Sequence, residues 1–452
     1  MAMSKTRGRA ISAALCCATL LLLPFAAAAD LLIENVTLID GTGAEPMTGA
    51  SVLVKGDRIF MISPSSIAHG AGVDVIDGKG KYLIPGMMDT HIHLQRGVIR
   101  GPKVPNDMAM TTEALHGYLY SGITSLVNYG ATDFIFPLRD QERDGKIVSP
   151  RIYSSGQSLA VHGGYGDGPG AFLIDDWAKA KPEMEAHYKK WKPDIQKVLI
   201  DRHGVFTPLD KVPTLDNLRD ALQVANENGV RTTVHAASEE DYDLALSAGI
   251  DAFAHAIRYP VSDRMITRLA TKQVPIATTA IVFEYIARIA DDTTFLDEPL
   301  FKATVNQEIL GLQKTEERSR YISSKMSAQY QAMRSLVPTN AKKLYDAGAI
   351  LATGTDRTWG PTLHMEFALM QKAGIPPAAI VKMATLNGAI YIGRQNDLGS
   401  IARGKLADLV LLTADPTRDV GNLQAIEAVI KDGKRIDLKK LNVPANKQAA
   451  QK

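Results

Sequence analysis

Residues 84–93, with the sequence IPGMMDTHIH, decide the fold of this chain. A Pro-Gly turn signal precedes an apolar run that ends in a His-x-His pair, a pattern that predicts a β-strand entered from a turn. Side chains two residues apart on a strand lie on the same side, so we expect His91 and His93 to project together from its C-terminal end. Two neutral imidazoles side by side can begin a binding site for zinc or a similar divalent ion.

Seven further short runs, apolar or rich in β-branched residues, follow along the chain. The stretches between most of them are amphipathic and long enough for helices, such as 215–227 and 239–248, and several end near a glycine as helices tend to. Eight alternations of strand and helix predict an α/β fold, the (β/α)8 TIM barrel, which places its chemistry at the C-terminal ends of its strands. The predicted strands are 86–93, 124–130, 151–157, 195–201, 231–237, 252–257, 275–280 and 350–356.

Ionisable side chains lie at the C-terminal ends of five of these predicted strands. They are His91 and His93 on the first strand, Lys197 on the fourth, His235 on the fifth, His255 on the sixth and Asp356 at the end of the eighth, with His162 just beyond the third. Because the strand ends of a barrel meet at one mouth, these groups are expected to converge there. Their order predicts a metal centre inside the barrel mouth, and hence a metal-dependent hydrolase.

Lys197 needs its own explanation, because an ammonium group is a poor metal ligand. Its ordinary pKa is about 10.4, and burying its charge unpaired in the apolar run 195–200 would be costly. If the amine adds carbon dioxide, Lys197 becomes an anionic carbamate that can bridge two metal ions. The alternative is a lysine whose charged end reaches solvent from the end of a strand. Its position between the ligands of the first and fifth strands favours the carbamate.

These motifs, in this order, resemble the amidohydrolase superfamily. The resemblance covers nearly all of the chain beyond residue 29 and rests on 84–93, DIQKV at 194–198, VHA at 234–236, AHA at 254–256, TGTD at 353–356, MATLNGA at 383–389, LGSI at 398–401 and GKLADLV at 404–410. The surroundings of Lys197, and His162 in VHGGY at 161–165, are similar to the prolidase-like binuclear metallodipeptidases and to the branch related to imidazolonepropionase.

The resemblance implies a centre of two divalent metal ions, by expectation Zn2+, with carbon dioxide bound as a carbamate on Lys197. Manganese and cobalt also suit nitrogen and oxygen ligands. By this resemblance His91, His93 and Asp356 would bind the more buried ion, His235 and His255 the more exposed one, and carboxylated Lys197 would bridge them.

The same resemblance implies how these groups act. A hydroxide held between the two ions would be the nucleophile, since coordination lowers the pKa of water toward neutrality. Asp356 would take the proton from that hydroxide and deliver it to the leaving nitrogen. His162 would donate a hydrogen bond to the developing oxyanion or hold a substrate carboxylate, unless it is a polar histidine in a Gly-rich turn. Tyr165 and Arg258 are further candidates for binding the substrate.

The predicted function is that of a secreted metal-dependent amidohydrolase that cleaves the amide C–N bond of a small molecule, either a dipeptide or an N-acyl amino acid. A cyclic amide or lactone hydrolase, similar to imidazolonepropionase, stays open because ring opening needs the same activated water. Deamination is disfavoured, since mononuclear deaminases of this superfamily resemble one another in carrying a glutamate three residues after the fifth-strand histidine, where this chain has Ser238. A non-catalytic binding protein is a third reading, disfavoured because every expected ligand is retained.

The first 29 residues have the pattern of a secretory signal peptide. Three basic residues precede an apolar run and an Ala-x-Ala cleavage site after Ala29, so we expect a periplasmic or secreted protein. The run is shorter than the ~20 residues that a membrane span needs, so no stable span is expected once the signal is removed. Both cysteines, Cys16 and Cys17, lie in this segment, which leaves histidine and carboxylate as metal ligands.

Charge and composition agree with a globular enzyme. Without residues 1–29 the chain has 48 basic and 49 acidic side chains, a balance that suggests no nucleic-acid-binding surface. It is compatible with a homo-oligomer.

The chain beyond the signal divides into a barrel and a smaller unit. We expect 30–84 and 398–438 to be β-rich ends that pair in a small β-sandwich, and 85–397 to be the barrel. A long helical insertion is predicted at 281–349, where it would serve as a lid or an oligomer contact. The final stretch, 439–452, reads as a polar, disordered tail.

Overall fold

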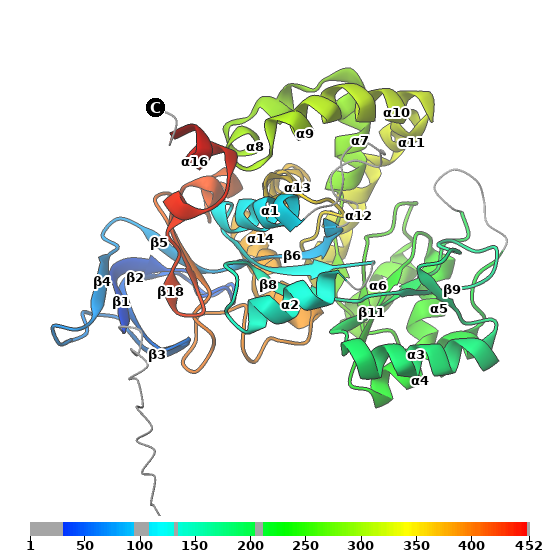
Figure 1. Cartoon of the computed structure of the whole chain (residues 1–452), viewed down its shortest axis with the longest axis horizontal. Coiled ribbons are helices and arrows are strands. Elements are labelled where there is room, and N and C mark those ends of the chain that lie inside the picture. The colour runs from blue at the N-terminus through cyan, green and yellow to red at the C-terminus, as the bar shows by residue number, and fades with distance from the viewer. Residues whose placement is uncertain (1–29, 95–107, 131–133, 204–210, 450–452) are drawn as a thin grey trace, which may run out of the picture.

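The computed structural model describes residues 30–94, 108–130, 134–203 and 211–449 (Figure 1). The predicted signal peptide at 1–29, with both cysteines, lies outside these residues. Among the residues that are described, no helix combines the length and apolar character needed to cross a membrane.

A closed barrel of parallel strands confirms the predicted fold. Its strands are β6 (Met87–Ile92), β7 (Ile123–Asn128), β8 (Arg151–Ser154) continued by β9 (Ser158–Ala160), β11 (Ile195–Leu199), β12 (Arg231–His235), β13 (Ala252–Phe253), β14 (Ile276–Ala277) and β15 (Leu351–Ala352). A short extra strand, β10 (Ala171–Leu173), pairs with β9. The last strand returns to the first, because Thr90 N donates to Thr353 O at 3.0 Å and Ile92 bridges Arg357 in parallel.

Helices surround this barrel, and local sequence signals explain where two of them begin. The side chain of Thr214 caps α4 (Leu215–Glu227) and that of Ser238 caps α5 (Glu239–Ala248), each within a reciprocal capping box. Both helices cover the ranges predicted from the sequence. The other helices of the layer are α1 (Met108–Tyr120), α2 (Ile135–Arg143), α3 (Trp177–Trp191), α6 (Asp263–Lys272), α13 (Gly360–Lys372), α14 (Pro377–Ala384) and α15 (Leu386–Tyr391).

Strands from both ends of the chain form the smaller unit, seen beside the barrel in Figure 1. They are β1 (Leu31–Leu38), β2 (Met47–Lys55), β3 (Arg58–Ser63), β4 (Asp74–Asp77), β5 (Tyr82–Pro85), β16 (Leu409–Leu412), β17 (Ile426–Lys431) and β18 (Lys434–Arg435), with a 3-10 turn, η4 (Val420–Gln424), between β16 and β17. The two ends join where β5 pairs antiparallel with β16. These strands belong to one hydrogen-bonded sheet, and apolar side chains from the N-terminal and C-terminal parts of the chain share one core.

A buried ionic network fastens this smaller unit to the barrel. Lys431 Nζ lies 3.0 Å from Glu142 Oε1, with 5% and 2% of the two side chains exposed. Arg151, at the start of β8, donates to Asp408 at 3.1 Å and to Asp432. Because paired charges can be buried where single ones cannot, these contacts fix one end of the barrel against the sheet.

The region predicted as a helical insertion is helical, and it covers the top of the molecule in the view of Figure 1. It consists of α7 (Ile281–Asp291), η2 (Thr294–Asp297), α8 (Pro299–Thr304), α9 (Gln307–Leu312), a π-helical turn η3 (Gln313–Glu317), α10 (Arg318–Ser323), α11 (Met326–Met333) and α12 (Leu336–Asp346).

The C-terminal stretch differs from the expectation of a disordered tail. A 3-10 turn, η5 (Leu438–Lys440), and a short helix, α16 (Pro444–Ala449), occupy most of it. Leu441 and Val443 are buried in one cluster with Leu119 and Val429. Two apolar side chains in an otherwise polar segment therefore help to attach it to the fold, together with a hydrogen bond of 2.7 Å from Asn442 N to His116 Nδ1 and an ion pair between Lys447 and Glu113.

Glu366, on α13, joins the insertion to the barrel. Its carboxylate is fully buried and accepts hydrogen bonds from Thr278 Oγ1 at 2.5 Å and from the backbone N–H groups of Ala280 and Ile281 at 3.1 and 2.6 Å. These groups lie between the end of β14 and the start of α7, a helix whose own N-cap residue provides no side-chain cap. Glu366 therefore supplies the acceptor that the first turn of the insertion lacks.

We predict that Glu366→Ala lowers the free energy of unfolding by about 3 kcal/mol or more, because each buried donor left without an acceptor costs roughly 1–3 kcal/mol. Urea denaturation followed by circular dichroism measures this change. Glu316→Ala, which removes an exposed carboxylate from the same insertion, is the control and should cost less than about 0.5 kcal/mol. Equal losses in the two variants would contradict the role given to Glu366.

Candidate metal centre

Four imidazoles meet at the C-terminal end of the barrel strands. His91 lies on β6, His93 follows it, His235 ends β12, and His255 lies two residues after β13. The ring centroids of His93 and His91 are 5.2 Å apart, those of His91 and His255 4.5 Å, and those of His255 and His235 4.7 Å. The rings therefore form one continuous chain across the mouth, from four separate positions in the sequence.

Three of these rings are held in the same way, through Nδ1. The partners of Nδ1 are Ala254 O for His91 at 2.9 Å, Tyr129 O for His93 at 2.8 Å, and Thr279 Oγ1 for His255 at 2.9 Å. A partner on one ring nitrogen fixes the orientation of a metal-binding histidine and leaves the other nitrogen for the ion. In these three residues that nitrogen is Nε2.

His235 is held through the opposite nitrogen. Its Nε2 lies 3.1 Å from Oδ2 of Asp201, a carboxylate with no solvent exposure just beyond β11. Asp201 also accepts a hydrogen bond of 2.6 Å from Arg258 Nη2. Burial disfavours the charged carboxylate, but the hydrogen bonds and charges of these two partners hold the pKa of Asp201 well below its ordinary value.

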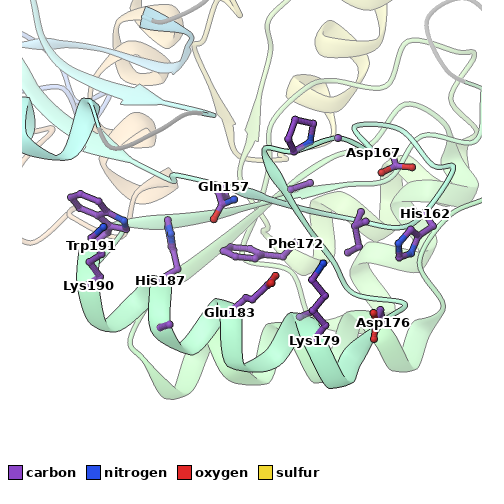
Figure 2. A pocket seen from close by; sticks show the side chains of 16 residues that line it. Gln157, His162, Asp167, Phe172, Asp176, Lys179, Glu183, His187, Lys190 and Trp191 are labelled. Carbon is purple, nitrogen blue, oxygen red and sulfur yellow. The ribbon is translucent and has the colours of Figure 1, made fainter.

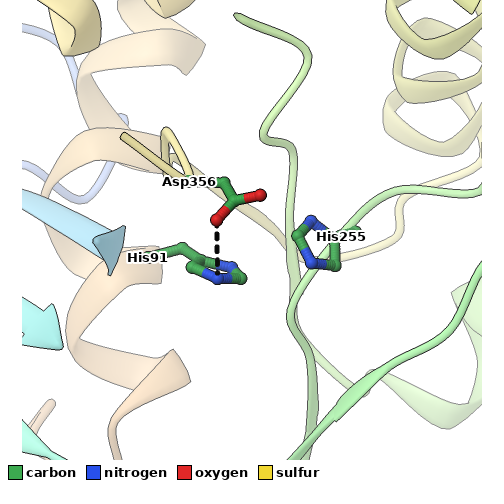
Figure 3. Close-up of side chains that lie close together, drawn as sticks. All are labelled: His91, His255 and Asp356. Carbon is green, nitrogen blue, oxygen red and sulfur yellow. Dashed lines mark ion pairs between the residues drawn. The ribbon is translucent and has the colours of Figure 1, made fainter. Parts of the chain in front are cut away.

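Asp356 brings a carboxylate to the same place from the end of the eighth strand. Its Oδ1 lies 2.8 Å from His93 Nε2 and 3.5 Å from His91 Nε2, and Figure 3 shows it beside His91 and His255. The backbone of Asp356 has a φ of +51°, in the left-handed region that side chains rarely adopt. Thr279, the partner of His255, has a φ of +45°. Strained residues of this kind persist where surrounding structure holds them, often at functional sites.

Lys197 lies on β11, near enough for its charge to act on His91, His235 and His255. The residue is 3% exposed, and Nζ lies 4.3 Å from the centroid of the Tyr129 ring. Burial, and then the charge of Lys197, lower the pKa of His91 well below its ordinary value. Burial also lowers the pKa of His255 well below its ordinary value and that of His235 to a lesser extent. A lowered pKa favours the neutral form of these three rings, which is the form that binds metals.

The donor set fits divalent metal ions. One ligand atom from each of His91, His255 and Asp356 can be chosen so that all three lie within 4.8 Å of one another. Neutral imidazole nitrogens and a carboxylate oxygen are ligands that zinc and similar ions prefer. All of the groups that the sequence assigned to the metals converge at this mouth, with Lys197 among them.

Of the predicted substrate-binding residues, two lie beside the centre. The ring of Tyr165 stacks on that of His235, with centroids 4.5 Å apart and planes at 14°. Arg258 lies three residues after His255, its side chain is 7% exposed, and its guanidinium is paired with Asp201. Arg258 is therefore engaged by a carboxylate of the protein itself, rather than facing the mouth as an isolated charge.

His162 lies elsewhere, contrary to its expected role. It lines a cavity of about 650 Å³ between α3 and the strands β9 and β10, together with Phe172 and His187 (Figure 2). Its Nδ1 bonds Asp175 Oδ1 at 3.0 Å, and its side chain is 54% exposed. Gly163, with a φ of +71°, turns the chain immediately after it, so that Tyr165 faces the histidines and His162 does not.

Three residues at the site are not among those predicted from the sequence. Asp201 ends the predicted strand 195–201, so the rule that singled out the other ionisable groups would have found it. Thr279 gave no signal, because a lone hydroxyl is common at strand ends. Tyr321, on α10, lies with its hydroxyl 3.3 Å from Nη1 of Arg357, the neighbour of Asp356. A lid was among the roles expected for the insertion, but no pattern in the sequence singles out Tyr321 as the residue that makes this contact.

A sequence profile of the amidohydrolase family matches residues 82–436, a range that includes every group described above. This chain is an amidohydrolase. It is a metal-dependent hydrolase that acts on carbon–nitrogen bonds of small molecules, as members of this family do.

Curated relatives of this amidohydrolase have diverse substrates. Imidazolonepropionase of Alkaliphilus metalliredigens is 24% identical over 85% of this chain and 89% of its own length. A 5'-deoxyadenosine deaminase of Methanothermobacter thermautotrophicus is 24% identical over 85% and 84%, and ochratoxinase of Aspergillus niger is 23% identical over 87% and 83%.

Solved structures confirm the fold. A Xaa-Pro dipeptidase with methionine bound in its active site superposes with a TM-score of 0.71 and 23% identity, covering 90% of this chain and 99% of the other. Molinate hydrolase gives a TM-score of 0.73 at 20% identity, with coverage of 92% and 96%.

We predict that His255→Ala weakens zinc binding at least roughly 100-fold in the site that loses its ligand. Removing only the hydrogen-bond partner of a metal ligand already weakens binding by roughly 10–100-fold, and loss of the ligand itself should cost more. Zinc per folded chain, measured by mass spectrometry of the metal after loading and desalting, tests this. His162→Ala is the matched control and should bind as much zinc as the wild type. A His255→Ala protein with undiminished zinc would contradict the assignment.

Proposed function

We propose that this amidohydrolase hydrolyses the amide bond of a dipeptide or an N-acyl amino acid at a binuclear centre, with zinc as the ion and Lys197 carboxylated. The observation that carries the proposal is the position of Lys197, which is buried on β11 over the ring of Tyr129, itself packed edge-on against His91. A carbamate on Lys197 would exchange a buried cation for an anion beside two cations, which is electrostatically favourable.

The ligands divide into two halves around Lys197. His91, His93 and Asp356 would hold one ion, and His235 and His255 the other. When bound, the ions supply an activated water of lowered pKa and polarise the carbonyl of the substrate.

Asp356 is the proposed proton carrier of the reaction. Water adds to the carbonyl carbon, the C–N bond breaks, and a proton of the water passes through the carboxylate of Asp356 to the leaving nitrogen. The contact of Oδ1 with His93 and the positive φ hold this carboxylate in place. No further reactant is needed, because the water supplies both the hydroxyl of the product acid and the proton of the product amine.

Aromatic side chains are proposed to enclose the substrate. Tyr165 stacks on His235, and Tyr330 on α11 is 8% exposed, within the electrostatic influence of Tyr165, Arg258 and Asp356. The insertion would then act as a wall or lid of the site. His162 has no part in the proposal, because its ring binds Asp175 outside the histidine chain.

Deamination is the activity that the site supports least. The position three residues after His235 is Ser238, whose hydroxyl accepts the backbone N–H of Asp241 and caps α5. A cap is a structural role, and it leaves no carboxylate at that position for acid catalysis. Hydrolysis of a cyclic amide or lactone is the second candidate, favoured by the near full-length similarity to imidazolonepropionase.

We predict that the zinc-loaded protein releases free amino acids from some members of a panel of dipeptides and N-acyl amino acids. Lys197→Ala should lower kcat/KM at least about 100-fold, and acetate or propionate should restore part of the lost activity. Loss of a bridging ligand should exceed the roughly 10–100-fold effect of losing a ligand's hydrogen-bond partner.

Lys190→Ala is the matched control for that variant. Lys190 Nζ lies 4.2 Å from the centroid of the Trp191 ring, a contact like that of Lys197, but on the surface. Its activity should equal that of the wild type. Full activity of Lys197→Ala would contradict the binuclear model, and cleavage of cyclic amides or lactones alone would favour the second candidate.

We also propose that the protein is exported after cleavage behind Ala29. The first strand, β1, starts at Leu31, so cleavage after Ala29 would leave it intact. Expression of the full chain in a Gram-negative host should give a periplasmic protein whose intact mass corresponds to a chain that begins at Asp30. A cytoplasmic protein that retains residues 1–29 would contradict this proposal.

A further inference from the structure

Asp201 connects two parts of the site that the chain itself keeps apart. It lies two residues beyond β11, is fully buried, and its Oδ2 accepts hydrogen bonds from both His235 Nε2 at 3.1 Å and Arg258 Nη2 at 2.6 Å. Its other oxygen, Oδ1, accepts the backbone N–H of His203 at 3.1 Å. Three contacts from separate segments therefore leave this carboxylate little freedom to turn.

The contact with Asp201 decides which nitrogen His235 can offer. Because Nε2 donates its hydrogen to the carboxylate, Nδ1 carries the lone pair. His91, His93 and His255 have the reverse arrangement, with Nδ1 held and Nε2 directed to the cluster. The Nδ1 partners of those three rings are neutral oxygens, whereas Nε2 of His235 is held by a carboxylate. A charged acceptor makes an imidazole a stronger ligand than a neutral one does.

The same carboxylate compensates the charge of Arg258. A buried guanidinium without a counter-ion next to a metal centre would repel cations and carry a high desolvation cost. Arg258 is paired with Asp201, and 7% of its side chain is exposed. Because the carboxylate balances its charge, Arg258 should repel a nearby metal ion less than an unpaired arginine would. One carboxylate thus acts on a metal ligand of the fifth strand and on a cation that follows the sixth.

We propose that Asp201 is a positioning residue that directs Nδ1 of His235 to the more exposed metal ion and compensates Arg258, so that metal affinity and the placement of Arg258 in the mouth depend on one side chain. This inference rests on the binuclear centre proposed above. The competing explanation is a buried ion pair that only stabilises the fold.

A second buried ion pair of the chain provides the control. Glu142 and Lys431 are 3.0 Å apart with 2% and 5% of their side chains exposed, and they belong to the network that joins the barrel to the smaller unit. Glu142→Gln and Asp201→Asn make the same chemical change in comparable burial. A role in stability alone predicts that both variants unfold more easily and that neither, once folded, changes its affinity for metal.

The test is a zinc titration of the metal-free full-length protein against a chromogenic chelator, with wild type, Asp201→Asn, Glu142→Gln and the double variant Asp201→Asn/Arg258→Met. For Asp201→Asn we expect the affinity of the weaker of two sites to fall roughly 10–100-fold and that of the tighter site to change less than about 3-fold. Glu142→Gln should bind like the wild type. The double variant should stay weak, because removing the cation does not restore the orientation of His235.

Two outcomes overturn the proposal: unchanged affinity in Asp201→Asn, or wild-type affinity in the double variant, which would reduce Asp201 to a counter-ion of Arg258. A wild type that binds no zinc would instead contradict the proposed function itself. Should Asp201→Asn not fold, nitrogen NMR of histidine-labelled wild type decides. On addition of zinc, His235 should coordinate through Nδ1 and retain its Nε2 hydrogen, while His91, His93 and His255 coordinate through Nε2. Coordination of His235 through Nε2 would rule the proposal out.

Discussion

The seam between the first and last barrel strands is the constraint on which the rest of the site depends. The backbone N–H groups of Thr355 and Asp356 both donate to the carbonyl oxygen of His91, at 3.2 and 2.7 Å. Behind them, the buried carboxylate of Asp89 accepts the backbone N–H of His91 and of Thr355, each at 3.1 Å. One seam thus places a histidine and a carboxylate side by side, although they come from opposite ends of the barrel sequence. Gly354 makes the close approach feasible, since a Cβ there would lie 3.0 Å from that of His91.

The histidines proposed for the two metal ions are held in different ways. His91 and His93 are held by backbone carbonyl groups, which are part of the barrel wall and cannot be removed by substitution. His255 and His235 are held by the side chains of Thr279 and Asp201. The orientation of His91 and His93 therefore depends on the backbone of the barrel, whereas that of His235 and His255 depends on two particular side chains. Tyr165 contacts His235 and Arg258 contacts Asp201, so the proposed metal ligands of this set and the residues proposed to bind the substrate share their supports.

Local patterns explain why the fold was predictable and why some details were not. Strand runs, glycine turns and capping residues such as Ser238 are encoded within a few positions, and the ends of barrel strands must meet, so the convergence of His91 with Asp356 followed from order alone. The direction of His162 did not follow, because it depends on the positive φ of Gly163 and on Asp175 thirteen residues later. The attachment of the C-terminal segment rests on Leu441 and Val443, whose burial partners are distant in the sequence.

The most direct test of a binuclear centre is anomalous X-ray diffraction at the zinc edge from crystals of the zinc-loaded protein. We predict two anomalous peaks at the barrel mouth, one beside His91, His93 and Asp356 and the other beside His235 and His255. Electron density between them should extend the side chain of Lys197 by a carboxylate. A single peak, or an unmodified Lys197 between two peaks, would contradict a binuclear centre bridged by carboxylated Lys197.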